Sequence, residues 1–227
     1  MSKLVLFDID GTLVLTGGAG VRAMNRACTA VLGIDDALAG VEYAGRTDWS
    51  ILHDALEKAG LQLDSARLDA IRTRYVSLLQ EEIQHRGTGV KAVLPGIRPL
   101  LDSLAAQDDV FLGLLTGNFA EAARIKLEYF DLWRFFRCGA FGDDSPDRNA
   151  LVPFAVTRAR ACGLSDMAAE RVFVIGDTPN DIACAHAAGA ISVAVATGNF
   201  SVDQLRDSGA RHVFGDLSDT ATFLSLL

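Results

Sequence analysis

Two aspartates, Asp8 and Asp10, lie two residues apart in the segment DIDGT, residues 8–12. The segment follows an apolar run, residues 4–7, that is typical of a buried strand. Because strand side chains alternate, positions two apart point the same way. Two like charges this close are costly unless a cation or a proton relieves their repulsion. Such a pair suits nucleophilic and acid–base chemistry beside a divalent metal ion.

A second pair of carboxylates follows another apolar run. Asp177 and Asp181 lie four residues apart in the segment GDTPND, after the strand-like residues 172–175. At a strand-to-helix turn, carboxylates with this spacing can converge on one cation. Oxygen ligands without nitrogen or sulfur suit magnesium. The sequence therefore predicts Mg²⁺ as cofactor.

Two further segments carry groups that suit a phosphate. The apolar run 110–115 ends in Thr116, whose hydroxyl and the amides of a following helix could donate to phosphate oxygens. Arg148 precedes a helix-period segment, and its planar fork can bind phosphate or carboxylate. Both residues have a plainer alternative, a helix cap for Thr116 or Asn118 and a surface position for Arg148. Lys126 stands in mid-helix, where we expect it to face solvent.

Taken in chain order, the four segments resemble the four signature motifs of the haloacid dehalogenase superfamily. Most of its members are phosphatases that form an aspartyl-phosphate intermediate. The first and fourth motifs are highly specific, and the second is weak by itself. The third departs from the usual pattern, because Arg148 stands where the family usually has a lysine.

The resemblance implies a role for each motif. Asp8 would attack phosphorus, and Asp10 would act first as general acid and then as general base. The non-bridging oxygens would be bound by Thr116 and Arg148, with Gly117 and Asn118 also contacting substrate. The implied magnesium ligands are Asp8, the backbone carbonyl of Asp10, Asp177 and, through water or from farther out, Asp181. An aspartate at position 10 favours phosphoryl transfer over dehalogenation.

The predicted fold is α/β, a doubly wound parallel sheet with an inserted α-helical cap. Continuous apolar runs indicate strands covered on both faces, and they alternate with helix-period segments. The predicted strands are residues 4–7, 110–115, 172–175 and 191–196, and the predicted core helices are residues 118–130, 151–162 and 181–188.

Residues 17–89 interrupt this alternation. They show no convincing strand and favour helices over residues 21–32, 48–59 and 64–85, with glycines on either side. We interpret residues 17–89 as an inserted helical bundle, and the resemblance implies that it is a cap domain which closes over a core made of residues 1–16 and 90–227. The alternative is one larger fold. Because related capped phosphatases place substrate-contacting residues at the start of a cap helix, Arg46 and Thr47 are expected to contact substrate, although Thr47 or Asp48 could simply cap that helix.

Composition limits the classes of partner that the chain is expected to bind. The 227 residues are 50% hydrophobic and 22% charged, with a net charge of −8. This acidic balance argues against non-specific binding to nucleic acid or to an anionic membrane. No apolar run approaches the roughly 20 residues of a membrane span. The N-terminus lacks a signal-peptide pattern, and four scattered cysteines favour reduced thiols, so a cytoplasmic location is expected.

The predicted activity is Mg²⁺-dependent hydrolysis of a small phosphomonoester, such as phosphoglycolate or a sugar phosphate. One alternative is a sugar phosphomutase of the same fold, and another is a catalytically idle phosphate-binding protein. The clustered carboxylates argue against the idle protein. A receiver-like signalling domain would be much shorter. The expected partner is a small-molecule phosphate ester, and the chain could be a monomer or a homodimer.

Overall fold

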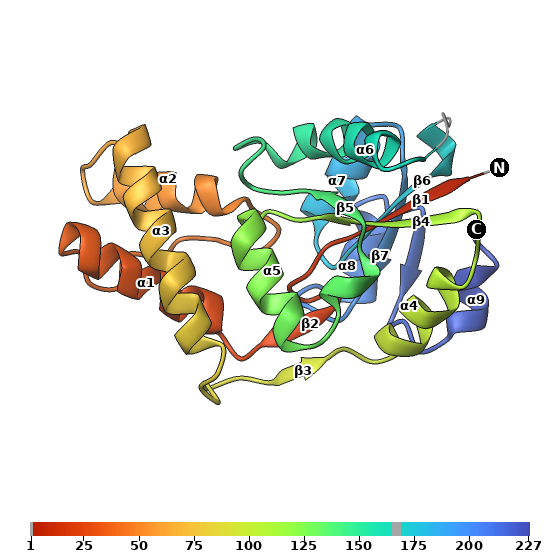
Figure 1. Ribbon diagram of the computed structural model, residues 1–227, viewed down its shortest axis with the longest axis horizontal. Helices are drawn as coiled ribbons and strands as arrows, with labels where there is room; N and C mark the ends of the chain where they lie inside the picture. Colours follow the sequence, from red (N-terminus) through yellow and green to blue (C-terminus); the bar gives the residue numbers. More distant parts are fainter. Residues whose placement is uncertain (1, 165–168) are drawn as a thin grey trace.

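The computed structural model describes residues 2–164 and 169–227. A parallel sheet with flanking helices forms one part of the molecule, and a group of helices forms the other (Figure 1). The strands follow the order β5-β4-β1-β6-β7-β8, and all neighbours are parallel. Their bounds are β1 (Lys3–Phe7), β4 (Val110–Leu115), β5 (Cys138–Ala140), β6 (Val172–Gly176), β7 (Ile191–Val195) and β8 (His212–Phe214). The predicted α/β fold is confirmed.

The register of β1 decides where its aspartates lie. Phe7 is paired with Leu114 of β4 on one side and with Ile175 of β6 on the other. The residues that follow these three strands therefore meet at one edge of the sheet. The carboxyl edge of a parallel sheet is where α/β proteins bind ligands.

Helices cover both faces of the sheet, as the alternation along β1 requires. Val5 and Phe7 pack in one cluster with residues of α4, α5 and α9, whereas Leu4 and Leu6 pack in another with residues of α6 and α7. The helices of this part are α4 (Ile97–Ala105), α5 (Ala120–Tyr129), α6 (Leu151–Ala161), α7 (Pro179–Ala187), α8 (Val202–Asp207) and α9 (Thr220–Leu224), with 3₁₀ turns at Trp133–Phe135, Arg148–Ala150 and Ala169–Arg171.

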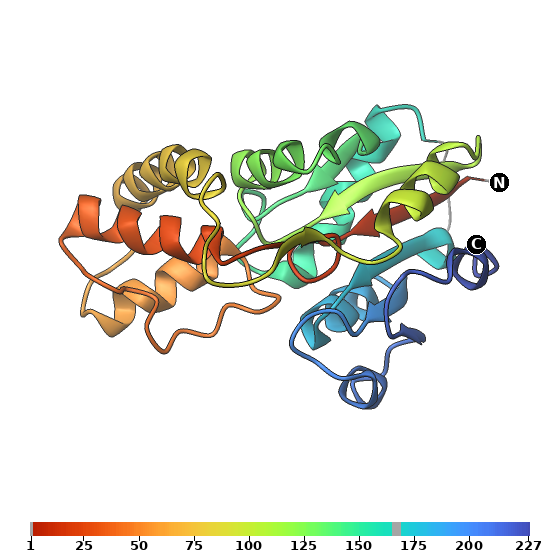
Figure 2. The same ribbon diagram turned by 90° about the horizontal axis from the view of Figure 1, so that it is seen from below.

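The three remaining helices are the expected cap helices, namely α1 (Ala19–Leu32), α2 (Asp48–Lys58) and α3 (Ser65–Glu82). They share a hydrophobic cluster that also takes in Phe119 and Ala122 of the core. Figure 2 shows them at one end of the molecule, with the C-terminus at the other. That residues 17–89 form a separate domain stays a prediction.

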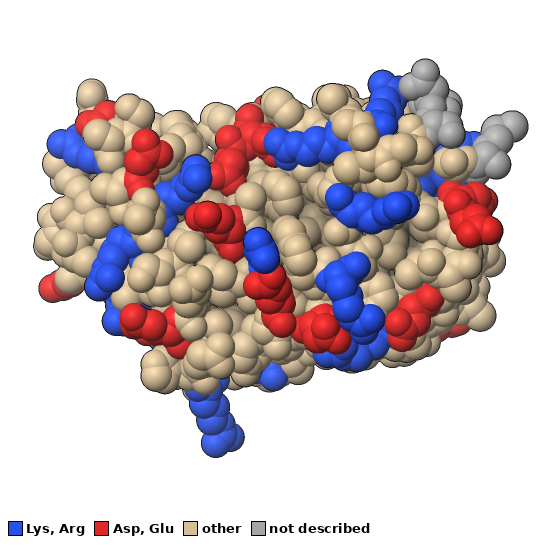
Figure 3. All heavy atoms as spheres, in the orientation of Figure 1, with Lys and Arg blue, Asp and Glu red and all other residues tan. Residues whose placement is uncertain are grey.

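Two short strands join the cap helices to the sheet. β2 (Val14–Thr16) and β3 (Lys91–Val93) form an antiparallel ribbon in which Thr16 is paired with Lys91. The chain therefore enters and leaves the cap helices at one place. No helix among the described residues is long and apolar enough to cross a membrane. On the face seen in Figure 3, basic and acidic side chains are interspersed.

Candidate active site

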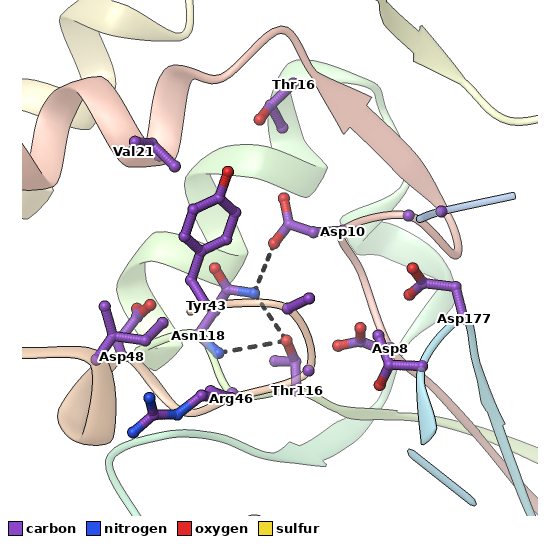
Figure 4. A pocket seen from close by; sticks show the side chains of 18 of the residues that line it. Asp8, Asp10, Thr16, Val21, Tyr43, Arg46, Asp48, Thr116, Asn118 and Asp177 are labelled. Carbon is purple, nitrogen blue, oxygen red and sulfur yellow. Dashed lines mark hydrogen bonds between the residues drawn. The ribbon is translucent and has the colours of Figure 1, made fainter. Parts of the chain in front are cut away.

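The strand ends border a cavity of about 240 Å³ between the sheet and the cap helices. Figure 4 shows side chains from both parts around it. From the core it is lined by Asp8, Asp10, Thr116, Gly117, Asn118, Lys126, Arg148 and Asp177, and from the cap and its linker by Leu15, Val21, Met24, Tyr43, Arg46, Ile51 and Tyr75, among others. All four predicted motifs thus contribute to one cavity.

Three buried carboxylates gather on the sheet side of this cavity. Asp8, Asp177 and Asp181 each offer an oxygen, and these oxygens lie within 4.8 Å of one another. Burial raises the pKa of Asp8 to about 6, although Arg148 opposes the shift. Burial, and then the charges of Asp181 and Asp8, raise the pKa of Asp177 to about 8. The cluster carries more negative charge than its surroundings compensate, so its oxygen-only donor set fits a divalent cation.

Two glycines confine the Asp177 carboxylate. A Cβ on Gly11 or on Gly198 would overlap that carboxylate, and Gly11 also has a left-handed φ of 81°. The Thr12 hydroxyl donates to Oδ1 of Asp177 at 3.2 Å. Gly11 lies within the DIDGT segment, whereas Gly198 lies beyond β7 in a loop with no motif, so the sequence offered no signal for it.

Arg148 lies inside the site rather than on the surface. Its Nη2 is 3.2 Å from Oδ1 of Asp8 and 2.5 Å from Oδ1 of Asp181. Its Nε is buried and has no hydrogen-bond partner among the described residues. Nothing in the described part of the chain therefore uses all of its donors, which leaves the guanidinium able to bind an anion.

Asp181 lies beneath the cavity and does not line it. Its Oδ2 accepts hydrogen bonds from the amide and the hydroxyl of Thr178, at 3.0 and 2.7 Å. Together the two residues form a capping box at the start of α7. Asp181 thus stabilises α7 and orients Arg148, besides belonging to the acidic cluster.

The end of β4 is organised around Asn118. Its Nδ2 donates to Oγ1 of Thr116 at 2.8 Å and to Oδ2 of Asp10 at 2.9 Å, as the dashed lines in Figure 4 show. Thr116 is fully buried at the cavity floor. The structure therefore brings the second motif against the first, and Asn118 does not act merely as a helix cap.

Lys126 does not face solvent, so that expectation is wrong. Its side chain is 5% exposed, and its Nζ lies 2.6 Å from Oδ2 of Asp10 and 2.6 Å from Oδ1 of Asn118. A signal was available in the sequence. Lys126 stands in the stripe that contains Ala122, Ala123 and Leu127, the buried face of α5.

The two cap residues predicted to touch substrate have different positions. Arg46 lines the cavity, but its guanidinium pairs with Asp54 at 2.7 Å, and in Figure 4 it points away from Asp8 and Asp10. Thr47 does not line the cavity. Its hydroxyl caps α2 by accepting from the Ser50 amide and donates to the carbonyl of Pro146 at 2.8 Å.

The start of α2 and the segment before it are docked on the core loops. The amide of Asp48 donates to the Gly117 carbonyl at 2.7 Å, and its carboxylate accepts from the Phe119 amide at 2.8 Å. Asn180 donates to the carbonyl of Ala44 at 3.1 Å. Burial raises the pKa of Asp48 to about 7. These contacts hold the cap helices closed over the cavity.

Known proteins resemble this chain in sequence and in fold. The family model for haloacid dehalogenase-like hydrolases matches residues 5–195. A phosphoglycolate phosphatase of Rhodospirillum rubrum is 29% identical over 99% of this chain and 91% of its own. The solved structure of a hydrolase from Pseudomonas syringae aligns with a TM-score of 0.72 at 21% identity, covering 99% of this chain and 98% of its own.

A second solved structure, described as a predicted phosphoglycolate phosphatase from Haemophilus somnus, aligns with a TM-score of 0.69 at 21% identity over 98% of each chain. At this identity the two structures support the fold, while the family match spans most of the chain. Family and relatives together identify an enzyme of the phosphatase kind. The chain therefore belongs to the haloacid dehalogenase-like hydrolase family, within which it resembles the phosphoglycolate phosphatases.

Proposed function

We propose that this chain is a Mg²⁺-dependent phosphatase that hydrolyses a small phosphomonoester through an aspartyl phosphate on Asp8. The main observation in support is that Asp8, Arg148 and Asp177 line one small cavity, which Asp10 also lines. We expect the substrate to be phosphoglycolate or a sugar phosphate. The similar protein from Rhodospirillum rubrum is named a phosphoglycolate phosphatase.

The first half of the reaction uses Asp8 and Asp10. A carboxylate oxygen of Asp8 attacks phosphorus, and the bond to the leaving oxygen breaks as Asp10 gives that oxygen a proton. Arg148 and Thr116 bind the non-bridging oxygens, where negative charge gathers in the transition state. The Nε of Arg148, which has no partner in the described part of the chain, is one donor available for this task.

The second half returns Asp8 to its starting state. Asp10, now deprotonated, takes a proton from the water that attacks the aspartyl phosphate, and phosphate leaves. The docked cap segment limits which water reaches the intermediate.

Asp8, Asp177 and the carbonyl of Asp10 would hold Mg²⁺, with Asp181 behind them. The ion would supply charge stabilisation for the transferring phosphoryl group. The raised pKa values of Asp8 and Asp177 support such a cation, because both carboxylates are buried without sufficient positive charge around them.

The size of the cavity favours a small phosphate ester as substrate over a phosphorylated macromolecule. Its volume of about 240 Å³ lies below the range of about 300–1,000 Å³ that is usual for drug-sized ligands. The cap wall adds the apolar side chains of Val21, Met24 and Ile51. The cytoplasmic location and the choice between monomer and homodimer stay predictions.

The test is phosphate release from a panel of small esters, including phosphoglycolate and hexose phosphates, with Mg²⁺ and with chelator. Asp8→Asn serves as the blank. We expect Mg²⁺-dependent release by the native chain and none by the variant. Release that persists in Asp8→Asn would contradict the covalent mechanism. If no ester releases phosphate, a sugar phosphate with a bisphosphate primer tests the mutase alternative.

A further inference from the structure

A charged side chain occupies a position that packing alone would give to an apolar one. Lys126 lies on the buried face of α5 with Ala122, Ala123 and Leu127. A leucine or methionine there would extend the same stripe without burying a charge. Burying an ion pair is weak evidence of a role in stability, because an apolar pair of the same volume often serves as well. The ammonium group therefore calls for another explanation.

The Lys126 ammonium has defined partners. Nζ donates to Oδ2 of Asp10 and to Oδ1 of Asn118, each at 2.6 Å. Asn118 in turn donates to the same Oδ2 through its Nδ2, at 2.9 Å. Lys126 and Asn118 thus both donate to the same oxygen of Asp10. Because the Asp10 side chain is 42% exposed, it would otherwise be free to rotate in the cavity.

The cap helices leave room for this ammonium. A Cβ on Gly20, in the first turn of α1, would lie 3.3 Å from Nζ of Lys126 and 3.6 Å from the hydroxyl of Tyr75. Any side chain at position 20 would therefore compete with Lys126 for the same space. Lys126 is 4% exposed, so little water competes with Asp10 for its ammonium group.

We propose that Lys126 is a positioning residue which, with Asn118, fixes the Asp10 carboxyl group for proton transfer to the leaving oxygen. This proposal rests on the proposed function, in which Asp10 is the acid and base. Lys126 acts through Asp10 and does not bind the phosphoryl group, which lies on the side of Arg148 and Asp8. Lys126 lies outside the four sequence motifs.

The proposal makes the effect of Lys126 depend on the leaving group. An alkoxide is a poor leaving group and needs the proton from Asp10 as the bond to phosphorus breaks. Acetate leaves without a proton. Ethyl phosphate and acetyl phosphate have nearly the same size, so they form a matched pair that differs in this need. A purely structural role for Lys126 would affect both substrates equally.

The experiment compares kcat/KM of Lys126→Met and of the native chain with both substrates in the presence of Mg²⁺. This quantity reports the steps up to formation of the aspartyl phosphate, which is where the leaving group departs. Asp8→Asn corrects for spontaneous hydrolysis of acetyl phosphate. The matched control is Arg124→Met, because Arg124 lies on the same helix but pairs at the surface with Glu128.

We expect Lys126→Met to lower kcat/KM by about 100-fold for ethyl phosphate and by no more than about threefold for acetyl phosphate. Arg124→Met should leave both values unchanged. In an Asp10→Asn background, Lys126→Met should have no further effect on ethyl phosphate, since the residue through which it acts is already disabled. Lys126→Gln keeps a hydrogen-bond donor without the charge, so its kcat/KM for ethyl phosphate should lie between the values of the native chain and of Lys126→Met.

The ratio of the two substrates is measured on one preparation, so a partly unfolded variant does not change it. Equal losses on both substrates, or a full additional loss in Asp10→Asn, would overturn the role of Lys126. If the native chain releases phosphate from neither ester and from none of the panel, the proposed phosphatase fails instead. The two failures are therefore distinct.

Discussion

The guanidinium of Arg148 lies 3.2 Å from the carboxylate of Asp8, and its Nε has no partner among the described residues. This arginine stands where the resembled family usually has a lysine. Arg148→Ala should lower kcat/KM by at least about 100-fold, because the transferring phosphoryl group loses its cation. Arg148→Lys should retain activity within about tenfold of the native value, since a point charge replaces the fork.

The control for Arg148 is Arg158→Ala. Arg158 pairs with Asp144 and does not line the cavity, so the variant should hydrolyse substrate at the native rate. Native kcat/KM in Arg148→Ala would remove Arg148 from the reaction. Thermal unfolding of each variant shows whether a loss of activity reflects a loss of fold.

Gly198→Ala should weaken metal binding. Its Cβ would overlap the Asp177 carboxylate, whose position the acidic cluster depends on. We expect the Mg²⁺ concentration for half-maximal activity to rise by about 10- to 100-fold, the usual effect of disturbing what orients a ligand. Gly215→Ala is the matched control, because nothing lies within 4 Å of its Cβ position. An unchanged metal requirement in Gly198→Ala would contradict the placement of Asp177 as a ligand.

Without metal, the stability of the fold should decrease as the pH rises. Burial raises the pKa of Asp8 to about 6, and burial and neighbouring charge raise that of Asp177 to about 8, both above 3.8 for a free aspartate. The folded chain therefore binds more protons than the unfolded chain between about pH 4 and pH 8, which makes unfolding easier as the pH rises. Melting temperatures in chelator should fall from pH 5 to pH 8.5.

Magnesium should remove this decline, because the cation favours the ionised carboxylates. The same melting series in Mg²⁺ should then show a temperature gain that grows with pH. Asp48 shifts in the same direction, with a pKa near 7, so Asp48→Asn separates its share from that of the acidic cluster. A melting temperature that rises with pH in chelator would refute the assignment.

Thr47→Ala should lower stability without changing substrate preference. The Thr47 hydroxyl caps α2 and bonds to the Pro146 carbonyl, outside the cavity. Loss of such a cap costs about 1 kcal/mol of unfolding free energy. Thr47→Ser, which keeps the hydroxyl, is the control. If the ranking of esters changes in Thr47→Ala and not in Thr47→Ser, the sequence-based prediction of substrate contact holds after all.

The longer elements were predictable because their patterns are long. Residues 110–115 and 172–175 are continuous apolar runs, and β4 and β6 follow them closely. The three-residue strands were missed. β5 consists of Cys138, Gly139 and Ala140, which show no strand preference, and it is held as a strand by its register against β4. β2 and β3 likewise depend on pairing between segments far apart in the sequence.

Some residues of the site could likewise be predicted from the sequence, and others could not. Asp8, Thr116 and Asp177 end apolar strands, so their convergence follows from the parallel sheet alone. The burial of Arg148 and Lys126 is different, because it depends on carboxylates contributed by distant segments. No local pattern tells a paired cation from a solvated one. The position of Lys126 in the buried stripe of α5 was the one indication in the sequence that its side chain is buried. Hydrophobicity scales point the other way, because they assign lysine to the surface.

The pairing of Thr16 with Lys91 bears on how this enzyme could change its substrate. The two ends of the helical insertion stand opposite each other in an antiparallel ribbon, where a two-residue turn is enough to connect them. If residues 17–89 form a separate domain, as predicted, we expect this ribbon to be a junction at which that domain can be shortened, lengthened or replaced. Because the ribbon stays intact across such an exchange, Asp8 and Asp10 keep their positions, and new specificities can arise on an unaltered chemical apparatus.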